Sequence, residues 1–513
     1  MFACNKVKFT NIMDLHGYAV AVAILLFFSI HLWRHNRNNP LPNWPIIGMS
    51  VGFLCNLSNI YDFLTKVLKY HGGTFMIQGP WFTNIKFVMT SDPMNVHHIT
   101  SKNFSNYGKG SEFHEMFEIL GDGIFNSDSK KWKFHRDILH SLFKNNNLES
   151  FNQQIIQKKL ETSLIPFLSH ASKQGTQVDL QDIFQRFSFD NICSMVLGFD
   201  PNCLPNNFTE LPEVAYEKAF NKMESAIYYR HVFPRSLCKL QKWFQIGHEK
   251  DLSESQVIID QFLYECIDQT KYNSNQADES NFDMLKALME ETGNEQIDDK
   301  FLRDTALNLL FAGRDTISAG LSWFFWLVST HPLVEAKILE EIRDTFVTKQ
   351  ESWLNLGVDE LKKMVYLHGA ICETLRLFPP VPVDHKCAIK SDILPSGYTI
   401  HPNTMVLYSL YAMGRNEETW GKDCLEFKPE RWVSEKGSNI YIPSYKFIAF
   451  NAGPRSCLGR NISFIQMKMV AVAMLWNFKV EVVEDHHVSP TVSIILHMKH
   501  GLKVKITKRC VSE

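Results

Sequence analysis

Hydrophobic side chains recur at three- and four-residue spacing over most of the chain beyond residue 92. This spacing is typical of amphipathic helices, and it predicts helices over Leu148 to Ser172 and over Ser253 to Lys271. A long, mostly apolar helix pattern runs from Asp298 to Thr330. Asp298 or Asp299 is suited to cap its first turn, and Pro332 ends it. The chain is therefore predicted to be rich in helix.

Strand-like patterns are short and lie apart from the helical region. Two of them, Thr74 to Gln78 and Ile85 to Thr90, precede the helices. β-rich character returns in Asp392 to Tyr411 and again from Phe478 to Lys508. Helices with small segregated sheets predict a mainly α fold of the α+β type.

The N-terminal segment differs from the rest. Leu15 to Trp33 is apolar and has no charge from Ala19 to Ile30. As a helix it would span about 28 Å, close to the ~30 Å hydrocarbon core of a bilayer. Arg34 and Arg37 follow at once, which predicts a single-pass anchor with the downstream chain in the cytosol. A cleaved signal peptide is the alternative, but the positive flank then lies on the wrong side.

Three regions follow from these patterns. Residues 1–37 hold the anchor and a short extension; Met13 is an alternative start, so the status of residues 1–12 stays open. Residues 38–47 form a hinge, in which Pro40, Pro42 and Pro45 predict a stiff extended connector. Residues 48–513 contain no linker or repeat and are expected to form one catalytic domain.

Composition and charge argue against some classes of function. The 513 residues carry a net charge of −2, which argues against nucleic acid as a partner. The 11 cysteines are scattered without a C-x-x-C pair, which favours free thiols in a reducing compartment. No G-x-G-x-x-G follows a predicted strand, so the chain shows no dinucleotide fingerprint of its own.

The segment from Phe450 to Gly459 combines an aromatic ring, two glycines, a cation and one thiol. A cysteine thiolate is the axial ligand that favours O–O cleavage at haem iron. Gly453 and Gly459 would let the backbone turn tightly and approach a flat cofactor. Arg455 could lower the pKa of the Cys457 thiol and reach a haem propionate. The alternative is a buried structural cysteine in a glycine-containing loop.

This segment resembles the haem-binding signature of the cytochromes P-450, the haem-thiolate monooxygenases. The resemblance implies a helix-rich haem domain with Cys457 as the iron ligand of haem b, and with Phe450 and Gly459 beside the cofactor. It also implies electrons from NADPH through a separate reductase, an endoplasmic reticulum membrane location with a cytosolic catalytic domain, and a hydrophobic small-molecule substrate.

A second motif lies inside the long apolar helix. Gly313 is expected to weaken the helix and open room for a small ligand, and Asp315 and Thr316 place an acid beside a hydroxyl. By itself the motif could equally be a kink with a surface-facing acid. With Cys457 it resembles the family's oxygen-activation motif, in which these groups deliver protons. Ala312 lacks a carboxylate, so ester-linked haem is not expected.

Further motifs resemble the family's supporting residues. Glu373 and Arg376 stand at i, i+3, and with Arg431 they resemble its Glu-Arg-Arg triad, a structural network rather than a catalytic one. Alone, such a pair is usually exposed. The resemblance also implies propionate donors, and the choice between Lys386 and His385 stays open. The expected donors are Trp132, Arg136, Arg455 and one of Lys386 or His385.

The substrate class follows only from resemblance. The segment Ala312 to Thr316, followed by Ser322 to Leu327, is similar to plant enzymes that hydroxylate fatty acids and long-chain alkanes, closest to mid-chain alkane hydroxylases. The same family contains alkaloid phenol-coupling oxidases, which remain an alternative. A non-catalytic haem sensor and a reductase-independent isomerase or dehydratase are further alternatives, which the intact Asp315 and Thr316 argue against. Exact substrate, regiochemistry and oligomeric state stay open.

Overall fold

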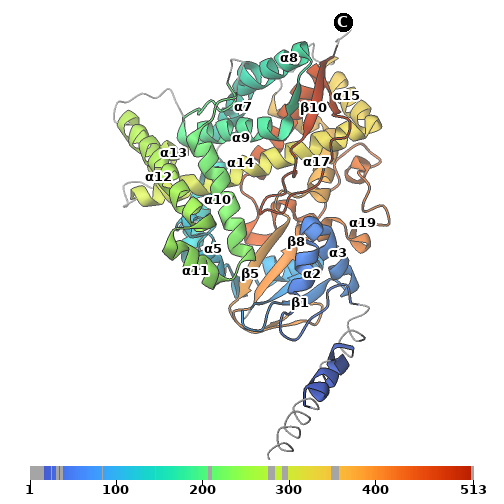
Figure 1. Ribbon diagram of the computed structural model, residues 1–513. Helices are drawn as coiled ribbons and strands as arrows, with labels where there is room; N and C mark the ends of the chain where they lie inside the picture. Colours follow the sequence, from blue (N-terminus) through green and yellow to red (C-terminus); the bar gives the residue numbers. More distant parts are fainter. Residues whose placement is uncertain are drawn as a thin grey trace, which may run out of the picture.

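The computed structural model describes residues 17–24, 26–30, 34, 39–83, 85–144, 146–205, 211–274, 284–291, 298–347 and 357–509. Helices make up most of this part of the chain (Figure 1). The helices of ten or more residues are α3 (Ile60–Tyr70), α6 (Ser129–Phe143), α7 (Asn146–Lys159), α8 (Ile165–Gln174), α9 (Leu180–Leu197), α10 (Ala215–Val232), α11 (Arg235–Phe244), α12 (Gly247–Ser274), α14 (Asp299–Thr330), α15 (Pro332–Val347), α17 (Val365–Leu377) and α20 (Arg460–Asn477). The shorter ones are α2 (Ser50–Cys55), α4 (Pro93–His97), α5 (Gly110–Met116), α13 (Met284–Glu291), α16 (Val358–Lys363), α18 (Leu410–Gly414) and α19 (Glu417–Trp420).

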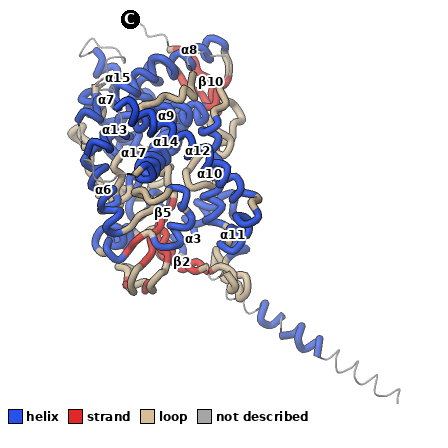
Figure 2. Tube along the Cα trace, turned by 90° about the vertical axis from the view of Figure 1, so that its left-hand side faces the viewer, coloured by secondary structure: helices blue, strands red, loops and turns tan. Residues whose placement is uncertain are grey.

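The strands form small sheets at two ends of the helical body (Figure 2). One sheet has the order β1-β2-β8-β5-β3, a second β4-β10-β9, and a third pairs β6 with β7. The strands are β1 (Thr74–Gln78), β2 (Lys86–Thr90), β3 (Tyr107–Gly108), β4 (Gln177–Asp179), β5 (Val383–Ala388), β6 (Asp392–Ile393), β7 (Thr399–Ile400), β8 (Met405–Ser409), β9 (Phe478–Val482) and β10 (Lys503–Lys508). The mainly α, α+β prediction is confirmed.

The core helix α14 crosses the middle of the molecule (Figure 1). The Asp298 side chain caps it by accepting a hydrogen bond from Phe301 N at 2.8 Å, and Pro332 begins α15. Because α14 is buried along most of its length, its apolar pattern has no single polar face. The Trp323 indole is anchored by donating to Leu496 O at 2.6 Å. This helix is therefore held in the core along most of its length.

Two predicted segments differ in the structure. The helix over Leu148 to Ser172 is interrupted between α7 and α8 by a π-helical turn, Leu160–Leu164. The hinge is not extended throughout, because Trp44 and Gly48 exchange backbone hydrogen bonds of 2.8 and 2.9 Å and close a turn. Gly48 has φ +59°, and a Cβ there would lie 2.3 Å from Gly79 O. That glycine thus lets the hinge turn against the end of β1.

The N-terminal apolar segment is helical over residues 17–24 and 26–30, with exposed apolar side chains such as Tyr18 and Phe27. Its predicted ends, Leu15 and Trp33, lie outside the described residues. Among the described residues, no single helix is both long and apolar enough to cross a membrane. One bent pair, α14 with Pro332–Phe346, meets the length and composition criteria.

Candidate active site

The segment around Cys457 is an irregular loop that leads into α20. Two 3-10 turns, Ile448–Phe450 and Gly453–Arg455, precede the cysteine, whose N–H donates to Phe450 O at 2.8 Å. Gly453 has φ +67°, and a Cβ there would lie 1.9 Å from Thr100 O, so this position requires glycine. Gly459 does not share that need, because its φ is −82° and a Cβ would meet only ordinary contacts at 3.9 Å.

The Cys457 thiol is surrounded by protein, yet it is accessible because it faces an internal cavity. Burial raises the pKa of this thiol, while the Gly459 N–H and the cations Arg136 and Arg460 lower it. Arg136 lies beside the loop, donating from Nη1 to Ser456 O at 2.6 Å. The prediction that Arg455 is the cation acting on the thiol is wrong, because its guanidinium is directed to Asp128 instead, at 2.6 Å.

The cavity has a volume of about 1470 Å³ and a mostly apolar lining. Phe450, Cys457 and Gly459 contribute to its wall, and so do Gly313 and Thr316 of α14. The sequence-predicted loop and helix motif, far apart in the chain, therefore open into one space. Such a space can hold a large flat cofactor and an apolar molecule together.

Cations gather at one side of this cavity. Arg455 stacks on the Trp132 ring at 4.7 Å from its centroid. Lys386 and Lys109, both nearly fully buried, lie 3.3 and 3.4 Å from the Asp384 carboxylate. Burial lowers the pKa of Lys109 well below its ordinary value, and the nearby Asp384 carboxylate offsets only part of this decrease. Arginine and lysine side chains outnumber the Asp128 and Asp384 carboxylates on this side, so they offer hydrogen-bond donors that suit an anionic group.

The choice between Lys386 and His385 has a geometric basis. Lys386 lies with Lys109 at Asp384, whereas the His385 ring lies 4.9 Å from the Phe113 ring and 5.6 Å from the His231 ring. Successive side chains of strand β5 point to opposite faces, which separates the two. Lys386 thus pairs with Asp384, while His385 packs on the Phe113 ring, over which Lys109 also lies at 3.9 Å. Which of the two meets a propionate stays a prediction.

The donor set fits a haem. The accessible Cys457 thiol faces the cavity, and the arginine and lysine side chains on its wall offer donors for the two haem propionates. The buried Nε of Arg455 has no hydrogen-bond partner in the described part of the chain, as expected of a donor that awaits an anion. Lys109 would join this set. Sequence reasoning missed it, and its only signal is a lysine between two glycines, Gly108 and Gly110.

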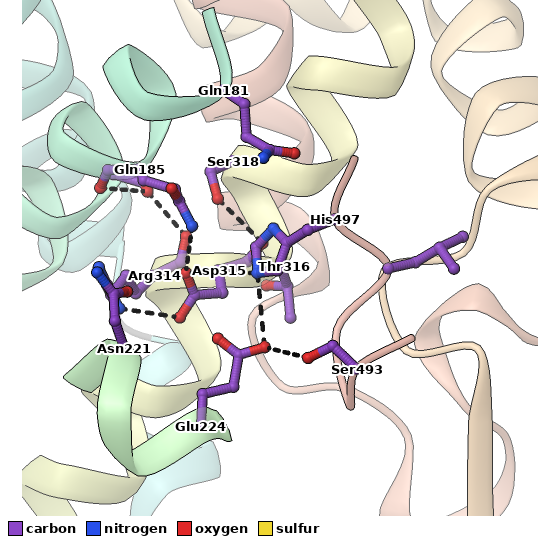
Figure 3. A network of polar contacts seen from close by, with 12 residues as sticks. Gln181, Gln185, Asn221, Glu224, Arg314, Asp315, Thr316, Ser318, Ser493 and His497 are labelled. Carbon is purple, nitrogen blue, oxygen red and sulfur yellow. Dashed lines mark hydrogen bonds and ion pairs between the residues drawn. The ribbon is translucent and has the colours of Figure 1, made fainter. Parts of the chain in front are cut away.

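The helix motif faces two ways. Thr316 lines the cavity, and its Oγ1 donates to Ala312 O at 2.7 Å, while Asp315 turns into a buried polar cluster (Figure 3). Burial raises the pKa of Asp315, although Arg314 beside it lowers it. Gly313 lies on the cavity wall, and a Cβ there would lie 2.5 Å from Ile192 Cδ1 of α9, so the glycine also lets α14 pack closely on α9. That Gly313 opens room for a ligand stays a prediction.

The Glu373, Arg376 and Arg431 side chains meet in the interior. Arg376 donates from Nε and Nη2 to the two Glu373 oxygens at 2.7 Å each, and both residues are buried. Arg431 Nε donates to Glu373 Oε1 at 3.3 Å and its Nη1 to Trp420 O at 2.6 Å. The bidentate pair lies within α17, and the Arg431–Glu373 hydrogen bond ties this helix to the turn that carries Arg431, away from the cavity.

An internal cavity walled by a thiol loop, a hydroxyl on a core helix and a cation cluster defines a haem-thiolate protein. The chain belongs to the cytochrome P450 family, whose model matches residues 39–506. It is 40% identical to alkane hydroxylase MAH1 of Arabidopsis thaliana over 95% of this chain and 97% of that protein. It is 39% identical to noroxomaritidine synthase of Narcissus aff. pseudonarcissus MK-2014, over 96% of each.

The fold agrees with that membership. A crystal structure of a cytochrome P450 (CYP102L1) superposes with a TM-score of 0.74 at 21% identity, covering 88% of this chain and 98% of the other. The chain is thus an oxidoreductase of the monooxygenase class. The family implies a haem-thiolate iron cofactor, a redox partner and hydrophobic substrates.

Proposed function

We propose that this protein inserts one oxygen atom from O₂ into a C–H bond of a long aliphatic substrate, an alkane or fatty acid. The observation that carries the proposal is the shared apolar cavity, which exposes the Cys457 thiol and the Thr316 hydroxyl to one space. When bound, the haem iron supplies the redox chemistry that activates O₂.

The residues around the cavity divide the remaining work. Cys457 would hold the iron, and the propionates would be held by the donors that surround them. These donors are Trp132, Arg136, Arg455, Lys386 and Lys109. Thr316 offers a hydroxyl at the cavity wall and Asp315 a protonatable carboxyl behind it. Together they would pass protons toward the reacting oxygen.

The apolar lining supports the aliphatic substrate. Phe113, Phe117, Phe125 and Phe311 form part of the wall, and an alkane needs few polar contacts. Each CH₂ that the cavity buries contributes about 0.8 kcal/mol, roughly fourfold in Kd. Affinity should therefore rise with chain length until the cavity is filled. The name of the relative MAH1 agrees with this class of substrate.

Phenol coupling is a second candidate that one observation favours. His385 is buried and both of its ring nitrogens lack a partner in the described part of the chain. Together with His231, also on the cavity wall, it offers polar atoms that could orient a phenol or an amine. The similarity to noroxomaritidine synthase also supports this second candidate.

We also propose that electrons come from NADPH through a separate reductase, and that the protein is anchored in the endoplasmic reticulum membrane by Leu15 to Trp33. Exposed Trp81 and Phe82, beside β1, would add apolar contact with the bilayer. Deleting residues 1–37 should weaken membrane attachment and leave a haem protein. A full-length protein found only in the soluble fraction would refute the anchor.

The test of the activity is turnover with reductase and NADPH under ¹⁸O₂. Alkanes and fatty acids of increasing length are compared with a phenolic amine. The aliphatic proposal predicts ¹⁸O in a hydroxylated chain and tighter binding of longer chains. A coupled product from the amine, without ¹⁸O and with no aliphatic turnover, would establish the second candidate.

A further inference from the structure

A buried polar cluster lies behind Asp315, outside the cavity wall (Figure 3). Three chain segments meet in it: α10 brings Glu224, α14 brings Asp315, and the C-terminal segment between β9 and β10 brings His497. One oxygen or nitrogen of each residue lies within 4.8 Å of the other two, and all three side chains are buried. No sequence motif marks Glu224 or His497.

His497 stands between two carboxylates. Its Nε2 is 3.5 Å from Glu224 Oε1 and 3.9 Å from Asp315 Oδ1. It is hydrogen-bonded to neither, and its Nδ1 also lacks a partner in the described part of the chain. A single N–H can serve one carboxylate at a time. A small rotation of the ring would bring it within hydrogen-bonding distance of either one.

The surrounding charges favour a shared proton over a metal ion. The completely buried Arg314 guanidinium contacts the Glu217 carboxylate at 3.1 Å and the Asp315 carboxylate at 3.4 Å. It therefore already supplies a positive charge beside these carboxylates. Three carboxyl groups then face two cationic side chains, Arg314 and His497. A divalent cation beside a buried guanidinium is disfavoured, whereas one carboxyl that keeps a proton balances the cluster.

The other hydrogen-bonding neighbours of Asp315 and Glu224 are polar but uncharged, whereas Glu217 also faces Asp182 of α9. Gln185 of α9 donates to Asp315 Oδ1 at 3.4 Å. Ser493 donates to Glu224 Oε1 at 2.9 Å and lines the cavity. The titratable groups beside Ser493 are Tyr61 of α3, whose hydroxyl donates to Ser493 O, and Tyr228 of α10. Burial raises the pKa of both phenols.

Protonation preferences agree with this geometry. Burial lowers the pKa of His497, but Glu224 and Asp315 raise it above its ordinary value. Burial raises the pKa of Glu224, yet His497 brings it below its ordinary value. Burial raises the pKa of Asp315. The stable arrangement is therefore a Glu224–His497 ion pair beside an Asp315 that can take up a proton.

We propose that His497 and Glu224 are positioning residues for Asp315, which His497 supplies with a proton from its Nε2. In this step the N–H bond of His497 breaks and an O–H bond forms on Asp315, leaving the imidazole neutral. His497 then regains a proton from water at the cavity wall, through the Ser493 hydroxyl and the Glu224 carboxylate. The inference rests on the proposed role of Asp315 in oxygen activation.

The test combines a titration with a turnover measurement, using His497→Gln and a control, His486→Gln, on the same C-terminal segment. His486 contacts Gly501 O and lies outside the cluster. The infrared carbonyl band of protonated Asp315, assigned by its loss in Asp315→Asn, is followed against pH in the haem-loaded protein. An opposite charge within 4–6 Å lowers the pKa of an acid by roughly 1–3 units. His497→Gln should therefore move the midpoint of this band upward by about one pH unit or more.

Turnover gives the second readout. The fraction of NADPH electrons that reaches product is measured against pH. The midpoint of this pH profile should differ from the wild type in His497→Gln and should match the wild type in His486→Gln. If His497→Gln does not fold, Glu224→Gln replaces it, and its profile should shift toward lower pH because His497 loses an anionic neighbour. An unchanged infrared midpoint in the folded variant, or an unchanged profile, overturns the inference. Absence of any NADPH-dependent product in the wild type overturns the proposed function, and the infrared titration still decides the inference.

Discussion

Replacing Glu373 by Gln perturbs the buried network without changing its volume. In the native protein the two Glu373 oxygens accept two hydrogen bonds from Arg376 and one from Arg431. They also accept one from the Trp432 indole at 2.9 Å and one from Lys428 N at 3.2 Å. A Gln amide keeps one acceptor and turns an NH₂ group toward these donors. Arg376 is then left buried with carbonyl partners alone, such as Cys424 O at 2.6 Å.

The expected loss of stability is large. Removing one partner of a buried ion pair costs about 3–5 kcal/mol, because the remaining charge has no counter-ion. Glu430→Gln is a matched control in the same turn as Arg431. Its carboxylate pairs with Lys337 at 2.6 Å, but both side chains are about half exposed, at 43% and 53%. Such a pair contributes roughly 0–1 kcal/mol.

The assay is denaturant unfolding, followed by haem absorbance and tryptophan fluorescence in parallel. The product of the slope and the midpoint gives the free energy of unfolding of each variant. Glu373→Gln should lose several times more than Glu430→Gln and should retain less haem after purification. A loss for Glu373→Gln within about 1 kcal/mol of the control would refute the claim that this buried network ties α17 to the turn that carries Arg431.

Three further predictions follow from single contacts. Gly313→Ala places a Cβ 2.5 Å from Ile192 Cδ1 and should destabilise the protein by about 1–3 kcal/mol. Adding Ile192→Ala should recover part of this loss, and full stability of the single variant would contradict the close packing of these two residues. Thr316→Ala should keep haem and substrate binding but divert electrons from NADPH to peroxide or water, and unchanged product per NADPH would argue against its role. Burial lowers the pKa of His368 to about 4. As the pH falls from about 6.5 to 4, this histidine is protonated in the unfolded chain before it is protonated in the folded protein, so the folded protein loses about 3 kcal/mol of stability over that window. His368→Leu should flatten this dependence of stability on pH.

Features with local signals could be predicted from the sequence. The helix α14 carries a capping aspartate, a mostly apolar pattern and a following proline, and each acts within a few residues of the chain. The Cys457 loop carries its glycines and cation at fixed spacing, so the amino-acid sequence alone identifies the thiol. Gly453 has the tight turn that this spacing predicted.

Features that depend on distant contacts could not be predicted. Lys109 gains its place only because β3 pairs with β5, far along the chain, which brings it to Asp384 and Lys386. His497 meets Asp315 only because the C-terminal segment folds back onto α14. The close packing at Gly313 could not be predicted for the same reason, since Ile192, which lies beside it, comes from another helix.

The ferrous carbonyl spectrum tests the central claim most directly, because its red-shifted band requires a thiolate ligand to haem iron. This band is expected in the wild type and in Cys238→Ser, whose cysteine also lines the cavity, and it should be lost in Cys457→Ser. A Cys457→Ser protein that keeps haem and still shows the red-shifted band would contradict the assignment of Cys457 as the iron ligand.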